Sequence, residues 1–88
     1  MPSKSPQAGK PQQALGRAIR EMRQRRNLTQ QELAELAGWQ AAEISSLERG
    51  RRNPTLHALG RVSEALGVKV SEMLALAERL EAGSGPHK

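Results

Sequence analysis

Two short amphipathic segments on either side of a glycine constrain the fold of this chain more than any other feature. The first opens with residues 29–32 (TQQE), a capping box in which Thr and Glu side chains satisfy unpaired amide groups at a helix start. Gly38 ends this segment, because glycine tolerates the left-handed conformation that closes a helix. A second segment follows over residues 40–49, and Gly50 closes it. The pattern predicts two short helices joined by a tight turn.

Apolar periodicity extends this helical pattern over most of the chain. Further helices are expected at residues 12–26, 54–66 and 70–82, and no segment alternates as a strand would. With one Trp and neither Phe nor Tyr, the core must consist of aliphatic side chains and Met, which suits helices. The sequence therefore predicts an all-α fold. The residues expected to face its core are Leu15, Ile19, Met22, Leu33, Leu36, Ala37, Ile44, Leu47, Leu56, Leu59, Val62, Leu66, Val70, Met73 and Leu74.

The chain has the length of one domain, since 88 residues rarely hold two separate cores. Residues 1–11 combine Pro, Ser, Gly and Lys without apolar periodicity, which predicts a flexible basic arm. Residues 83–88 are similarly poor in apolar side chains and predict a flexible tail. The folded domain is therefore expected over residues 12–82.

The composition argues against most chemical functions. The chain has no Cys and no Asp, and His57 and His87 stand apart from other ligand-type residues, so neither a metal nor a cofactor is expected. No Ser/His/Asp or Cys/His set is present, which argues against an enzyme. A small-molecule effector is also not expected, because no sensor domain fits. No apolar run reaches the roughly 18 residues of a membrane span, and a cytoplasmic protein is the default expectation.

The charge distribution favours a polyanionic partner. The net charge is +5, and it is concentrated in residues 1–62, where eleven Lys and Arg residues face five Glu residues. Residues 63–88 hold three basic and four acidic residues. The first two thirds of the chain therefore carry the positive field.

The stretch LTQQELAELAG followed by WQAAEISSLERGRRNPT resembles the XRE-type helix-turn-helix family, typified by phage repressors, Cro proteins and restriction-modification controller proteins. The resemblance covers Leu15 to Leu74 and rests on several motifs in the same order and spacing. It implies a compact five-helix, lambda-repressor-like domain with the helix-turn-helix at the second and third helices. It also implies a homodimeric transcriptional regulator of double-stranded DNA, with repression as the leading interpretation and activation left open.

In this family the third helix lies in the major groove, which is wide enough for one α helix. Ile44 and Leu47 are expected to fix its buried face, so the other side chains would project from it. This chain has Gln40 and Ala41 where better-known members often carry a Ser or Thr cap followed by Gln, so their target sequence does not transfer. The candidate base-reading residues are Gln40, Ala41, Ala42, Glu43, Ser45, Ser46 and Arg49.

Gln can pair with adenine and Ala can meet a thymine methyl, while Glu43 can accept from cytosine N4 and Arg49 can reach guanine. Two alanines at this face leave few hydrogen bonds to bases, so shape readout and Arg contacts are expected to contribute more.

Other residues are expected to contact the DNA backbone or to hold the domain together. Similar proteins place the glutamine at the start of the second helix against a phosphate, where helix amide groups favour an anion. The family also implies a structural ion pair between Arg23 and Glu48. Isolated basic residues are expected on solvated helix faces, namely Arg25, Arg61 and Arg79. Trp39 is expected to be partly buried at the turn, with a base or sugar contact as the alternative. The candidate phosphate-binding residues are Thr29, Gln30, Arg51, Arg52 and Asn53.

The last predicted helix suggests an interface. Met73 is expected in the core, and Leu76 and Leu80 extend its apolar stripe beyond what so small a core needs. Met73, Leu76 and Leu80 are therefore the residues predicted at the interface of a two-fold dimer. An alternative is an antitoxin or adaptor whose last helix and tail hold a protein partner, because fold alone does not decide function.

Overall fold

The computed structural model describes residues 10–83, and over this range it contains five α helices and no strand. Residues 1–9 and 84–88, which make up most of the predicted arm and tail, lie outside the described residues. None of the five helices is long and apolar enough to cross a membrane. The predicted all-α class is confirmed. The helices are α1 (Lys10–Arg25), α2 (Gln30–Ala37), α3 (Ala41–Glu48), α4 (Leu56–Leu66) and α5 (Val70–Gly83).

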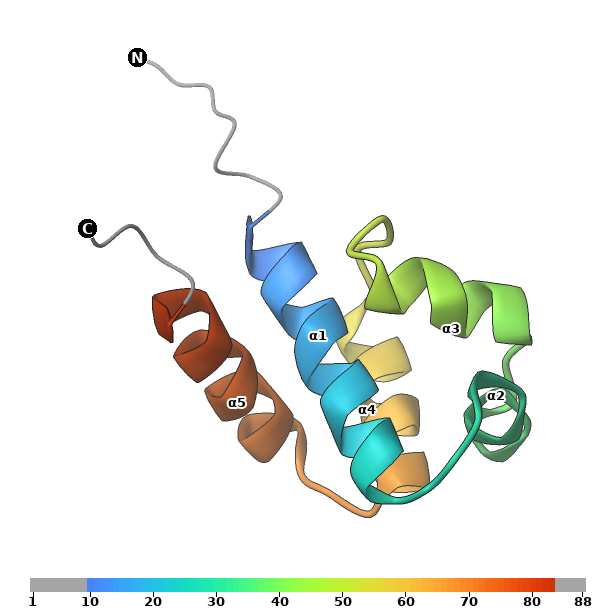
Figure 1. Cartoon of the computed structure of the whole chain (residues 1–88). Coiled ribbons are helices and arrows are strands. Elements are labelled where there is room, and N and C mark those ends of the chain that lie inside the picture. The colour runs from blue at the N-terminus through green and yellow to red at the C-terminus, as the bar shows by residue number, and fades with distance from the viewer. Residues whose placement is uncertain (1–9, 84–88) are drawn as a thin grey trace.

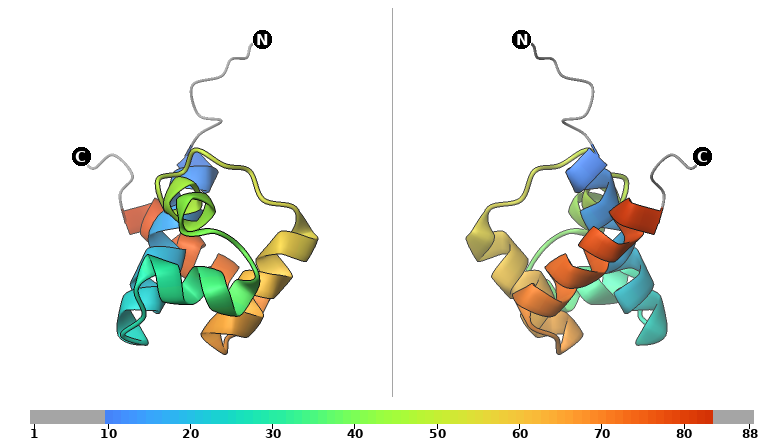
Figure 2. Two further views of the ribbon diagram at one scale, coloured as in Figure 1. Left: turned by 90° about the vertical axis from the view of Figure 1, so that its right-hand side faces the viewer. Right: turned by 90° about the vertical axis from the view of Figure 1, so that its left-hand side faces the viewer.

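α1 is the central element of the arrangement. It packs against α5 on one side, where the two helices run antiparallel, and against α3 on the other (Figure 1). α4 packs against α2 and α5, and two further views show α2 crossing one face and α5 covering the opposite one (Figure 2). All five helices contribute to one core. Its fully buried large side chains are Ile19, Leu33, Ile44, Leu47, Val62, Leu66 and Met73.

The predicted signals at the ends of α2 are present. Thr29 Oγ1 accepts a hydrogen bond from the Glu32 amide at 3.0 Å, and Glu32 Oε1 accepts from the Thr29 amide at 2.8 Å. At the other end Gly38 takes a left-handed conformation with φ 74°. The chain then turns, and the Trp39 amide donates to the Ala34 carbonyl at 2.8 Å. Local signals thus fix both the start of α2 and the turn that leads into α3.

Three leucines expected in the core are exposed instead. Leu36 is 61% exposed and Leu74 is 40% exposed, while Leu56 occupies the first position of α4 and is 74% exposed. In α2 the buried side chains are Leu33, Ala34 and Ala37, and Leu36 lies about 100° around the helix from the centre of that group. Leu74 is displaced by a similar angle from the buried face of α5. A helix buries one stripe, and these side chains lie beside it.

The approach of α1 to α3 depends on Gly16. A Cβ atom on this residue would lie 2.5 Å from the carbonyl oxygens of Leu47 and Glu48, closer than such atoms can come. The absent side chain lets the end of α3 rest directly on the backbone of α1. This contact fixes how α3 is presented at the surface.

Candidate nucleic-acid interface

α3 is held at the edge of the domain with one face buried. Its inward side chains are Ile44, Leu47 and Glu48, and α2 packs behind it. The side chains predicted to read bases are all at least partly accessible. Gln40, Ala42 and Arg49 are exposed, and Ala41, Glu43, Ser45 and Ser46 are half-buried.

Gln40 and Glu43 define the first turn of α3. Gln40 is the N-cap residue, so α3 begins one residue after the predicted start. Glu43 Oε1 accepts a hydrogen bond from the Gln40 amide at 2.9 Å. Glu43 Oε2 lies 3.5 Å from Arg52 Nη2. The carboxylate therefore already has partners within the protein, and an amino group of cytosine would have to compete with them.

A polar network joins α1, α2 and α3. Arg23 Nε lies 2.6 Å from Glu48 Oε2 and Arg23 Nη2 lies 3.1 Å from Glu48 Oε1, so the expected ion pair is present as a two-point contact. Gln30 Nε2 donates to Glu48 Oε1 at 3.0 Å, and Arg23 Nη1 donates to the Leu28 carbonyl at 2.8 Å. The hydrogen bond to Glu48 raises the pKa of Arg23, so the guanidinium stays charged.

This network forms the floor of a basic pocket on the outer surface. The pocket has a volume of about 240 Å³, and three arginines and one glutamate line it. Arg20 is exposed on α1, and sequence reasoning did not assign it to the site. The available signal was its spacing, because Arg20 and Arg23 lie three residues apart on one helix and share a face. The lining residues are Arg20, Arg23, Gln30, Ser45, Glu48 and Arg49.

The exposed polar residues of the loop between α3 and α4 include Arg51, Arg52 and Asn53. Gly50 begins this loop with φ 73°, and a Cβ atom there would lie 2.8 Å from the Cα of Gln13. The start of the loop is thus packed against α1. Its basic side chains extend the accessible surface beyond the end of α3.

Trp39 occupies the turn before α3. It is half-buried and packs against the core, as expected. The Cζ atom of Arg52 lies 5.5 Å from the centre of its ring, within the range of a cation–π contact. Arg52, which follows α3, therefore contacts Trp39 in the turn before α3.

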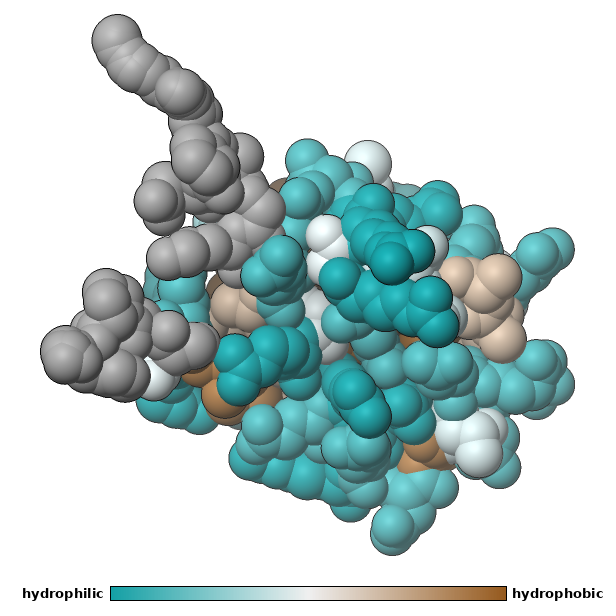
Figure 3. Space-filling model, turned by 45° about the horizontal axis from the view of Figure 1, so that its top comes forward, coloured by the Kyte–Doolittle hydropathy of each residue, from teal (hydrophilic) through white to brown (hydrophobic). Residues whose placement is uncertain are grey.

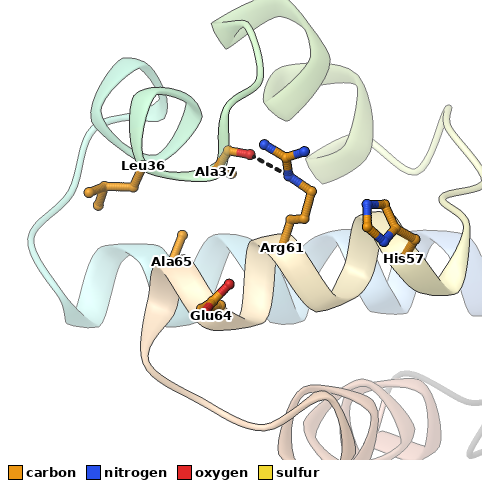
Figure 4. Close-up of a pocket in the computed structure, with 6 residues that line it drawn as sticks. All are labelled: Leu36, Ala37, His57, Arg61, Glu64 and Ala65. Carbon is orange, nitrogen blue, oxygen red and sulfur yellow. Dashed lines mark hydrogen bonds between the residues drawn. The ribbon is translucent and has the colours of Figure 1, made fainter.

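Arg61 is not the purely solvated side chain that the sequence suggested. Its Nε donates a hydrogen bond to the Ala37 carbonyl at 2.9 Å, across a pocket of about 460 Å³ between α2 and α4 (Figure 4). A cation at this place satisfies a carbonyl left unpaired at the end of α2. Arg25 forms an ion pair with Glu21 on the exposed face of α1.

The apolar stripe predicted on α5 is not exposed at Leu76, whereas Met73 is buried, as expected of a core residue. Met73 is fully buried and Leu76 is 4% exposed, because both point into the core against the neighbouring helices. Leu80 is half-buried. The exposed leucine of this helix is Leu74, and it lines a pocket of about 290 Å³ together with Leu15.

The surface of the domain is predominantly polar on the side that is at the top of Figure 1. A space-filling view of this side is mostly hydrophilic, with separate apolar patches in brown and tan (Figure 3). The surface therefore suits a charged, hydrated partner better than an apolar one.

Comparison with known families gives a match over more than half of the chain. A family profile described as Helix-turn-helix matches residues 19–73, a range that includes α2, α3 and α4 in full. The expected resemblance is thereby confirmed at the level of the family.

Curated relatives include regulators of the kinds expected. The immunity repressor protein of Bacillus phage phi105 is 40% identical over 60 residues, which is 68% of this chain and 42% of the repressor. The control protein C.SmaI of Serratia marcescens is 38% identical over 60 residues, or 68% of this chain and 71% of the control protein. The phage repressor is thus more than twice as long as the segment it shares.

A solved structure shares the fold as well. The clp gene regulator ClgR from C. glutamicum superposes with a TM-score of 0.77 and 36% sequence identity. The match covers 78% of this chain and 88% of that chain. This chain is therefore similar to that regulator both in sequence and in the arrangement of its helices.

Proposed function

The chain belongs to the helix-turn-helix family of DNA-binding transcription regulators, which are not enzymes, and we propose that it acts as a homodimeric repressor with α3 in the major groove. Repression would follow from occupation of a promoter. We place this activity in the cytoplasm, because a regulator must reach the DNA it controls.

The observation that carries the proposal is the way in which α2 and α3 are joined and presented. Three residues separate the helices, and α3 buries one face while the predicted reading residues remain accessible. A helix supported in this way can enter the groove with its first turn leading. Ala42 and Arg49 are exposed in α3 and at its C-cap, and we propose that they reach base edges together with Ser46.

Backbone phosphates are the proposed ligands of the surrounding basic residues. The pocket lined by Arg20, Gln30 and Arg49 lies where α1, the start of α2 and the end of α3 meet. Its cations and the helix start both favour an anion. Arg51, Arg52 and Asn53 would continue these contacts along the same strand, since all three are exposed in the loop after α3.

A dimer would compensate for the small area of DNA that one domain can contact. A single domain of this size buries little DNA surface, whereas two copies can bind half-sites about 34 Å apart and combine their affinities. We propose that the outer face of α5 forms this interface, with the exposed Leu74 at its centre in place of the buried Met73 and Leu76.

The test is the selection of bound duplexes from a random DNA pool at near-physiological salt, followed by sequencing. We expect an enriched inverted repeat whose half-sites lie about one helical turn apart. Arg49→Ala should change the enriched sequence, because Arg49 is proposed to reach a base edge. Arg79→Ala is the matched control, because it removes the same charge from α5 and should leave the enriched sequence unchanged. If the unaltered protein enriches no sequence, the DNA-binding proposal is wrong, and the antitoxin or adaptor alternative becomes the one to pursue.

A further inference from the structure

The guanidinium of Arg52 lies between Trp39 and Glu43, and we infer that Trp39 is a positioning residue that holds Arg52 for a DNA phosphate beside the start of α3. This inference rests on the proposed function and gives Trp39 an indirect role in DNA binding rather than a direct base or sugar contact. It concerns the arrangement of the free protein before any DNA arrives.

The geometry places the end of one segment against the start of another. Arg52 follows the last residue of α3 by four positions, but its guanidinium contacts residues at the opposite end of the helix. Its Cζ lies 5.5 Å from the centre of the Trp39 ring, and its Nη2 lies 3.5 Å from Glu43 Oε2. The side chain therefore lies along the first turn of α3, the end that is expected to lead into the groove.

The two contacts differ in kind. The Trp39 ring is half-buried against the core, so it offers a fixed surface to the cation. Glu43 is held by its hydrogen bond from the Gln40 amide, and its contact with Arg52 is at the long end of an ion pair. A phosphate can therefore replace Glu43 as the anionic partner while the guanidinium keeps its place on the ring.

The arrangement leaves Arg52 available to a ligand. Its side chain is 46% exposed, and a guanidinium can offer two parallel N–H groups to phosphate oxygens. Arg51 is the natural comparison, because it is exposed in the same loop. The cation–π contact with Trp39 is made by Arg52. Ordering a long side chain before binding reduces the entropy lost on binding.

Fluorescence tests the contact without DNA. Trp39 is the only Trp of the chain, so its emission reports on this place alone. We expect Arg52→Ala to change the intensity or wavelength of that emission and Arg51→Ala to leave it unchanged. An unchanged spectrum for Arg52→Ala would overturn the inference, whatever the DNA experiments give.

A double-mutant cycle on the selected DNA site tests the role in binding. We expect Trp39→Leu to weaken binding about three- to tenfold, in line with the cost of ordering one long side chain. Arg52→Ala should weaken it at least as much and lower the slope of log K against log salt by about 0.9. The double variant should bind no more weakly than Arg52→Ala, because Trp39 acts through Arg52. Trp39→Leu with Arg51→Ala should be additive.

Trp39→Phe guards against a loss of fold, since it keeps an aromatic surface and should retain most of the affinity; thermal unfolding of each variant is measured in parallel. Additive losses for Trp39→Leu and Arg52→Ala, with DNA binding intact, overturn this inference alone. Absence of DNA binding by the unaltered protein overturns the proposed function and this inference together.

Discussion

Glu48 of α3 is tied to Arg23 of α1 by two hydrogen bonds, of 2.6 and 3.1 Å, although the two residues are 25 positions apart in the chain. Their side chains are 3% and 11% exposed, respectively. Gln30 of α2 shares the same carboxylate. The orientation of α3 relative to α1 and α2 therefore depends on one nearly buried charge.

Removing either member should destabilise the domain. Glu48→Ala leaves the Arg23 guanidinium without its partner, and the free energy of unfolding should fall by about 3–5 kcal/mol. Urea denaturation followed by circular dichroism measures this change. Arg25→Ala is the control, because the exposed ion pair with Glu21 should contribute less than about 1 kcal/mol. Equal losses for the two variants would contradict a special role for Glu48.

Gly16→Ala should also destabilise the domain. The added methyl group would meet the Leu47 and Glu48 carbonyl oxygens at 2.5 Å, and backbone atoms cannot rotate away as side chains do. We expect a loss of about 1–3 kcal/mol or more. Gly60→Ala is matched to it, because no atom lies within 4 Å of the added group and the helix should gain about 0.5–1 kcal/mol. The difference between the free energies of unfolding of the two variants, measured by urea denaturation, gives the cost of the contact.

Local features of the fold could be predicted from the sequence, whereas contacts between distant residues could not. Periodicity and capping signals act over a few residues, so the five helices and the turn at Gly38 could be predicted from them. The pair of Arg23 and Glu48 came from the family pattern rather than from any local signal. Gly16 reads in sequence only as a weak helix former, since its role depends on which backbone lies opposite.

The incorrect assignments have a similar cause. A row of leucines spaced along a helix does not say which way the helix is rotated, and neighbours in three dimensions decide this. Met73 and Leu76 fill the core, whereas Leu36 and Leu74 lie beside the buried stripe. Arg61 was expected on a solvated face and Arg20 was not assigned to the site, because the end of α2 and the basic pocket that surround them exist only in the folded chain.

The exposed side chains of α3 should determine which bases the protein prefers. Ala42, Ser46 and Arg49 are accessible there, so replacing all three with the residues of a different relative should change the sequence enriched from a random pool. Each substituted contact should alter discrimination at its position by about 1–3 kcal/mol. An unchanged preference in the triple variant would mean that another element reads the bases.

Substitution of Gln30 or Arg51 should change the affinity for all DNA sequences alike. Both are proposed to contact phosphates, so Ala substitutions should weaken binding to any duplex, and Arg51→Ala should lower the salt slope by about 0.9. Gln30→Ala removes a neutral group and should leave that slope unchanged. It also removes a hydrogen bond to Glu48, and unfolding measurements must separate the two effects. A change of preferred bases in Arg51→Ala would argue against a phosphate contact.

The oligomeric state should depend on Leu74 rather than on the leucine two positions later. Leu74 is 40% exposed on the outer face of α5, so Leu74→Glu should give a folded monomer that binds a half-site but loses the cooperative binding to an inverted repeat. Leu76→Glu should instead unfold the protein, because Leu76 is 4% exposed and a charge there would be buried without a partner. Leu36→Glu is the matched control, since Leu36 is an exposed leucine on α2 and its replacement should leave the dimer intact. Sedimentation velocity, read together with circular dichroism, distinguishes the three outcomes. A dimer that survives Leu74→Glu but dissociates in Leu36→Glu would move the interface from α5 to α2.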